Sequence, residues 1–316
     1  MIWGHNKKRR EKTMTTKGKA IKTAEEKAMA NARRLESMRR NLDALESKAN
    51  AIMNKGAESV SYEEARTLLS LLKIAYHDSG KIEEIASIDG TSACEFCAKM
   101  RAAADDNNLI ICGGCYAYAD KWKEAAWRRH QLNARILSFV VYPKELLEKL
   151  AIPSILCRIN EDGDVSNVTH ARNILRIMEA FKFFTSFGFW YKNVSAVAEA
   201  LKAEGVTNNA EKRRKYRRTR FVQSSVLIGF PAVPAWFSDV VFTVYPDKET
   251  TEKAIVEGAW ECNGRKCKDC GFNCYDSERN TYDGNVQHVA EVLRCNANKR
   301  AEIMDAYRAK LESMNK

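Results

Sequence analysis

The strongest indication of the fold lies in residues 154–203, which read SILCRINEDGDVSNVTHARNILRIMEAFKFFTSFGFWYKNVSAVAEALKA. Apolar or β-branched runs over 154–159 and 183–191 alternate here with amphipathic runs over 168–180 and 194–203. Such alternation is typical of parallel strands that are joined by helical crossovers. We therefore predict an α/β protein built on a partial (β/α) barrel or a parallel sheet.

The segments on either side extend this pattern. Two more apolar runs, 222–230 and 240–245, predict further strands. Ser61 followed by Glu64 is the capping-box pattern that opens a helix. Stretches rich in helix-forming residues and free of Pro predict long helices at three more places, namely 23–51, 116–136 and 286–314.

Positive charge is concentrated at the N-terminus. The first 50 residues contain 14 basic and 6 acidic side chains, so they carry +8 of the chain's net +11. Together with the predicted elements, this distribution divides the chain into five regions. They are a basic flexible tail (1–22), a helical N-terminal region (23–80), an α/β metal-binding core (81–250), a C-terminal cysteine segment (251–285) and a C-terminal helix (286–316).

Length and composition narrow the class of protein. A chain of 316 residues, 45% of them hydrophobic, can bury a substantial core. The sequence lacks an 18-residue apolar stretch, which argues against a membrane span, and its basic start MIWGHNKKRREK precedes no apolar run that would make a secretory signal. We expect a cytoplasmic, reducing compartment, in which thiols persist as metal ligands or redox groups rather than as disulfides.

Eight of the ten cysteines fall into two groups. The first group has a CEFC unit, a spacer of fourteen residues and a CGGC unit, and its thiols belong to Cys94, Cys97, Cys112 and Cys115. Two CxxC turns can bring four sulfurs to one point, and the Gly113–Gly114 pair lets the backbone bend around an ion. A structural zinc site and an iron–sulfur cluster both fit this spacing.

The second group has the spacing Cx4Cx2Cx3C, in Cys262, Cys267, Cys270 and Cys274. Its first three thiols have the spacing of plant-type ferredoxins, although zinc also accepts such clustering. Lys266 and Lys268 would offset the charge of metal-bound thiolates. Because the segment is short and polar, we expect its fold to depend on the metal. Cys157 lies in an apolar run and is interpreted as a small buried residue.

A basic run follows the fourth predicted element of the core. It places seven cations within nine positions, with an aromatic residue, Tyr216, among them. The cations are Lys212, Arg213, Arg214, Lys215, Arg217, Arg218 and Arg220. Cations beside an aromatic ring can contact phosphates while the ring stacks on a base, whereas a solvated connection between a helix and a strand would have the same composition. With the basic N-terminus, this run favours nucleic acid as the partner.

The cysteine landmarks resemble those of a known family. A CGGC unit followed by Tyr116–Ala117, the segment 158–164 (RINEDGD) and the late cysteine group occur in the order found in the "gene product eighty-eight" family of phage- and mobile-element-encoded proteins. That family is itself similar to radical S-adenosylmethionine (SAM) proteins. The resemblance covers residues 85–275 and implies a phage or mobile-element origin in a bacterial host.

The resemblance has consequences for the cofactors. It implies that Cys97, Cys112 and Cys115 hold a [4Fe-4S] cluster whose remaining iron binds SAM, with Cys94 outside the ligand set. It further implies that Glu161, Asp162 and Asp164 accept hydrogen bonds from the amino group of SAM. The late cysteines would then hold an auxiliary cluster or zinc.

Two functions are consistent with these features. The first is an iron–sulfur protein that resembles radical SAM enzymes and acts on a nucleic acid or nucleotide. The second is a non-enzymatic, zinc-stabilised nucleic-acid-binding protein. Hydrolase and nucleoside triphosphatase activities have no support, because the sequence contains neither a GxSxG elbow nor a P-loop.

Overall fold

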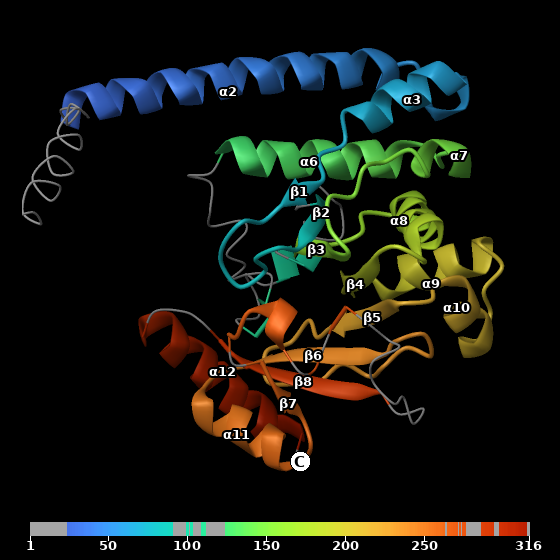
Figure 1. Cartoon of the computed structure of the whole chain (residues 1–316). Coiled ribbons are helices and arrows are strands. Elements are labelled where there is room, and N and C mark those ends of the chain that lie inside the picture. Colours follow the sequence, from blue (N-terminus) through green and yellow to red (C-terminus); the bar gives the residue numbers. More distant parts are fainter. Residues whose placement is uncertain are drawn as a thin grey trace, which may run out of the picture. The chain divides into compact units, whose positions relative to one another are not determined.

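The computed structural model of the chain describes residues 24–90, 99–100, 102–103, 109–111, 124–262, 264–270, 272, 274–275, 286–293 and 297–314 (Figure 1). The chain divides into two compact units, the first ending at Ala44 and the second beginning at Leu45. Helix α2 (Ala24–Met53) crosses this boundary. All further description concerns the larger unit.

Helices in the larger unit are α3 (Tyr62–Ser70), α6 (Glu124–Phe139), α7 (Lys144–Leu147), α8 (Val168–Phe181), α9 (Val194–Ala203), α10 (Asn209–Lys215), α11 (Lys248–Val256) and α12 (Ala297–Met314). The strands are β1 (Ala75–Tyr76), β2 (Ala86–Gly90), β3 (Leu156–Gly163), β4 (Ser186–Tyr191), β5 (Thr219–Ser224), β6 (Val240–Tyr245), β7 (Trp260–Glu261) and β8 (Gln287–Val292). Within the described residues, no helix is long and apolar enough to cross a membrane.

These strands form one sheet in the order β1-β2-β3-β4-β5-β6-β8-β7. All neighbouring pairs are parallel except β1 with β2, which is antiparallel. From β2 to β6 each new strand is added beside the previous one. Because crossovers between parallel strands are right-handed, this order places the connecting helices on one face, as in (β/α) barrels. The α/β prediction with a parallel sheet is therefore confirmed.

Side chains alternate between the two faces of the sheet. Cys157, Phe187 and Phe221 pack in one core with residues of α6, α8 and α9. Figure 1 shows these helices along one side of the sheet. Their neighbours Leu156 and Val222 point to the opposite face and join a second apolar cluster. Strand β4 is buried at every position, as expected for a parallel strand covered on both sides. We call the second face the inner face of the sheet.

Several boundaries agree with the sequence patterns. Helix α9 and strand β6 have the predicted limits, and α8 extends one residue past its predicted end. The capping box at Ser61 is present, with the Glu64 N–H donating to the serine hydroxyl. Cys157 is fully buried in the core, as its apolar surroundings predict.

The prediction of one helix over 286–314 is wrong in its first part. Residues 287–292 (QHVAEV) form strand β8 between β6 and β7, and helix α12 begins only at Ala297. Ala and Glu in this stretch are good helix formers, but the hydrogen bonds offered by two flanking strands outweigh this local preference. The strand predicted over 222–230 is also displaced, since β5 runs from Thr219 to Ser224.

Candidate metal centre

The second cysteine group lies against the inner face of the sheet. Its backbone is fixed at two points: the Cys262 N–H donates to the Ala290 carbonyl of β8 (2.8 Å), and the Cys267 N–H donates to the Lys81 carbonyl (2.7 Å). All four thiols pack on the inner-face cluster, which contains Trp190, Phe272 and Tyr275. The segment approaches β4 so closely that a Cβ added at Gly188 would lie 2.9 Å from the Cys274 carbonyl oxygen.

The four thiols are electrostatic neighbours. Burial raises the pKa of the Cys274 thiol to about 12, Arg220 lowers it, and Cys262, Cys267 and Cys270 each raise it further. Burial also raises the pKa of Cys267, against the opposing effect of Arg158 and Lys81. These mutual effects agree with the packing of all four sulfurs on the inner-face cluster.

Three cations approach this thiol group from different parts of the chain. Lys81 donates from its Nζ to the Cys262 Sγ at 3.2 Å and to Glu291 at 3.1 Å. Arg158, on β3, places its guanidinium 4.3 Å from the centroid of the Trp190 ring. Arg220, on β5 and only 1% exposed, donates to the Phe272 carbonyl at 3.0 Å. Arg158 and Arg220 both lie on the inner face of their strands. Sequence reasoning missed this role, because the only sign of it in the sequence is that each arginine alternates with apolar residues along its strand.

The thiols are free, and their arrangement is looser than a ligand shell. Cys157, Cys262, Cys267, Cys270 and Cys274 form no disulfide. Within the part of the chain that the structure describes, no three Cys, His, Asp or Glu side chains are placed closely enough to hold a metal ion. The described residues do provide four sulfur atoms that could act as metal ligands, three nearby cations and an apolar wall. Thiolates in such surroundings suit zinc or an iron–sulfur cluster.

The first cysteine group, Cys94, Cys97, Cys112 and Cys115, lies outside the described residues, but the chain on either side of it is described. Gly90 ends strand β2 at the carboxyl edge of the sheet. Ile110 pairs with Leu227, which follows strand β5, and the Ile111 N–H donates to the Val226 carbonyl at 2.9 Å. The chain therefore lies at the carboxyl edge both at Gly90, before the first CxxC unit, and at Ile110 and Ile111, directly before the second. Sites form at this edge in (β/α) barrels.

The acidic segment ends β3 at the same edge, and the structure corrects one of its predicted roles. The side chains of Glu161 and Asp162 lie outside the described residues. Asp164 is 1% exposed, and its carboxylate accepts hydrogen bonds from the backbone N–H groups of Val165, Lys192 and Asn193, at 2.7, 2.7 and 3.0 Å. This carboxylate joins the loops after β3 and β4, so the prediction that Asp164 binds the cofactor is wrong.

Asp164 and the nearby His170 are expected to give opposite pH dependences of stability. Burial raises the pKa of Asp164 from 3.8 to about 6 and lowers the pKa of His170 from 6.5 to about 3. Asp164 therefore stabilises the fold at low pH and loses this contribution as the pH rises through 6, whereas His170 contributes above its unfolded pKa and loses that contribution as the pH falls. Between about pH 4 and pH 6 the two effects nearly cancel.

Single substitutions should reveal the two contributions separately. Relative to the unaltered protein, Asp164→Asn is expected to lose about 1.4 kcal/mol of unfolding free energy per pH unit as the pH falls from about 6 to about 4. His170→Asn, which keeps an acceptor for the Ser166 N–H, is expected to gain a similar amount. Denaturant unfolding at several pH values measures both, and equal slopes for the two variants would contradict the assignment.

The basic run is not one exposed patch. Lys212, Tyr216 and Arg220 are at most 2% exposed, so the prediction that they contact nucleic acid is wrong. Lys212, on α10, and Tyr216, the residue after this helix, both face inward, and Arg220 lies on the inner face of β5. The side chains of Arg213, Arg214 and Arg217 are exposed, while Lys215 and Arg218 are half-buried. Lys215 donates to the Glu204 carbonyl.

Comparisons with known proteins identify no relative. No protein-family model matches the chain, and neither the curated proteins nor the solved structures contain a significant match.

Proposed function

We propose that this chain is a metalloprotein with two cysteine-bound centres, and that the first centre performs radical SAM-type chemistry. The observation that carries the metal assignment is the second cysteine group, whose four thiols and three neighbouring cations gather on the inner face of the sheet. Four thiolates around a divalent ion, or around a [4Fe-4S]²⁺ cluster, leave a net charge of about −2. Lys81, Arg158 and Arg220 stabilise such a buried anion.

The sheet supports the same proposal for the first group. Parallel strands from β2 to β6 follow one another in chain order, and the first cysteine group lies in the connection after β2. Residues 109–111, directly before Cys112, are paired beside the chain that leaves β5. In this proposal Cys97, Cys112 and Cys115 hold a cluster at the carboxyl edge, and Glu161 and Asp162, at the end of β3, receive the amino group of SAM.

The chemistry divides between the cofactor and the chain. The cluster, when bound, supplies the electron that cleaves SAM reductively. The chain positions the ligands, and Asp164 fixes the adjoining loops through three backbone N–H groups. Aromatic and aliphatic side chains, among them Trp190 and Val222, cover the inner face of the sheet and exclude water from it.

Reductive cleavage of SAM tests this proposal. Protein purified without oxygen and reduced with dithionite is expected to be brown and to convert SAM into 5′-deoxyadenosine and methionine. The variant Cys112→Ala should lose the reaction, whereas Cys157→Ala, which removes a thiol from the opposite face of β3, should retain it. A colourless protein with stoichiometric zinc and no cleavage would instead favour the non-enzymatic, zinc-stabilised alternative.

A further inference from the structure

Two exposed phenyl rings stand at the amino edge of the sheet. Phe183 is 63% exposed and Phe184 is 73% exposed, in the turn between α8 and β4. Ile155, 71% exposed, precedes β3 and lies beside them, because its carbonyl accepts from the Ser186 N–H at 2.8 Å. Exposed aromatic rings forfeit the stabilisation of burial, so a contiguous group of them indicates an interaction surface.

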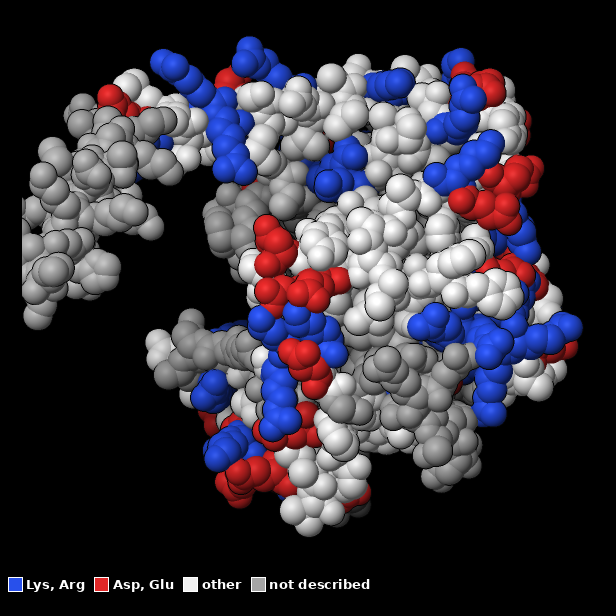
Figure 2. Space-filling view, in the orientation of Figure 1, with Lys and Arg blue, Asp and Glu red and all other residues white. Residues whose placement is uncertain are grey.

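Cations adjoin these rings. The Lys182 ammonium lies 5.3 Å from the centroid of the Phe183 ring. The turn before β5 is next along the same edge, since the Phe187 N–H donates to the Arg218 carbonyl at 3.0 Å. Figure 2 shows Lys and Arg side chains gathered over the part of this face where Figure 1 places α10. The exposed residues of the basic run, Arg213, Arg214 and Arg217, belong to this region.

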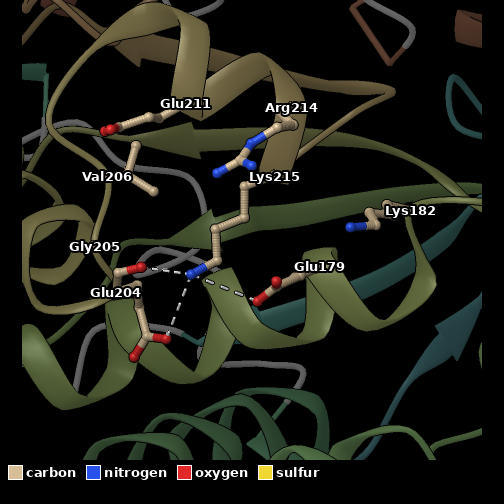
Figure 3. Close-up of a pocket in the computed structure, with 8 residues that line it drawn as sticks. All are labelled: Glu179, Lys182, Glu204, Gly205, Val206, Glu211, Arg214 and Lys215. Atoms are coloured by element: carbon tan, nitrogen blue, oxygen red, sulfur yellow. Dashed lines mark hydrogen bonds and ion pairs between the residues drawn. The ribbon is translucent and has the colours of Figure 1, made fainter.

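A pocket of about 420 Å³ is lined in part by Lys182, Arg214 and Lys215 (Figure 3), and Lys182 directly precedes the two rings in the chain. Its acidic residues are already engaged. Glu204 pairs with Arg172 and Arg176, both at 2.9 Å, and Glu179 pairs with Lys144 at 2.7 Å. Glu211 accepts from the backbone N–H and the hydroxyl of Thr207.

The remaining cations of the pocket have different partners. Lys215 donates to the carbonyl of Glu204, so it neutralises the C-terminal end of α9. Lys182 and Arg214 form no ion pair with any residue that the structure describes, and Figure 3 shows both reaching the pocket without a marked interaction. Two cations without counter-charges beside a hollow and two aromatic rings favour an anionic, ring-bearing ligand.

We propose that this surface, made of Phe183, Phe184, Lys182 and Arg214, binds single-stranded nucleic acid. Phe183 and Phe184 stack on unpaired bases, and Lys182 and Arg214 contact the phosphates in and beside the pocket. A duplex offers no free base faces to the rings, so the surface selects single strands. The inference goes beyond the proposed metal chemistry, because it rests on the amino edge of the sheet and needs neither cysteine group.

Fluorescence anisotropy with a labelled oligothymidylate tests this surface in the full-length protein. Phe183→Ala and Phe184→Ala are each expected to weaken binding about 5- to 150-fold, which is the range for the loss of one stacked base. Lys182→Gln and Arg214→Gln should each reduce the slope of log affinity against log salt by about 0.7, the value for one phosphate contact with a single strand. Lys248→Gln, which removes an exposed cation on α11, should change neither quantity.

Two results would overturn the proposal of a single-strand-binding surface. Every variant keeps the basic N-terminal segment 1–50. If the double variant Phe183→Ala/Phe184→Ala bound as tightly as the unaltered protein, the two rings would contribute nothing to binding, and the proposal would be overturned. Equal affinity for a duplex of the same length, or for polyglutamate, would also overturn it, because charge alone would then explain binding. Metal content measured on the same samples separates this result from the metal proposal, since these surface variants should retain all of their metal.

Discussion

Replacing both Cys267 and Cys274 by alanine is expected to release residues 262–275 from the inner face of the sheet. Ordering the backbone of these fourteen residues costs at least about 14 kcal/mol. Burial of Phe272 and Tyr275, the large apolar side chains of the segment, returns only about 3–6 kcal/mol. A cysteine-bound metal contributes about 10 kcal/mol or more, which closes the difference.

Hydrogen exchange measures this release directly. In the metal-loaded protein the N–H groups of Cys262 and Cys267 should exchange slowly, because they donate to Ala290 and Lys81. In the double variant, or after chelation, both should exchange at nearly the rate of an unstructured peptide, while β4 and α8 stay protected. Slow exchange of the segment without metal would mean that its apolar contacts alone hold it on the sheet, and would contradict the prediction. Cys157→Ala is the matched control, because this thiol is buried on the other face of β3.

Lys212→Met is expected to destabilise the fold by about 3–5 kcal/mol. The Lys212 ammonium, with its side chain 3% exposed, donates to Asp239 Oδ1 at 2.6 Å and to the Phe237 carbonyl at 2.7 Å. Methionine fills the same space without a charge, so it leaves the Asp239 carboxylate buried with the Phe221 N–H as its described donor. An uncompensated buried charge is what makes the loss large.

Denaturant unfolding of three variants tests this role of Lys212. The second substitution in Lys212→Met/Asp239→Asn removes the unpaired charge, so the double variant should recover part of the stability. Arg214→Gln, two residues away and exposed, should stay within about 0.5 kcal/mol of the unaltered protein. If Lys212→Met lowered the free energy of unfolding no more than Arg214→Gln does, the buried ion pair would contribute nothing to stability.

Periodicity made much of the central fold predictable. Helices α8 and α9 follow their amphipathic patterns, and each begins at an asparagine whose side chain accepts from a backbone N–H in the first turn. Strand β8 was not predictable from local preference, because its stability comes from β6 and β7. Alternation of strands and helices thus predicts the order of the central elements better than it predicts a strand such as β8, which depends on its neighbours in the sheet.

The candidate site was predictable only in part. Cysteine spacing indicated the four thiols of the second group, but not the cations around them. Arg158 and Arg220 reach the thiols from strands β3 and β5, and Lys81 reaches them from the connection between β1 and β2. The density of charge in 212–220 suggested an exposed patch. That run crosses the end of a helix, a turn and the start of a strand, so its residues face the core and the solvent in turn.

Metal analysis of paired variants tests the central claim most directly. Protein purified without oxygen should contain two separable complements of metal, with Cys112→Ala/Cys115→Ala losing one, Cys267→Ala/Cys274→Ala losing the other, and Cys157→Ala losing neither. Metal content that is negligible in the unaltered protein, or the same in all three variants, would contradict the assignment of two cysteine-bound centres.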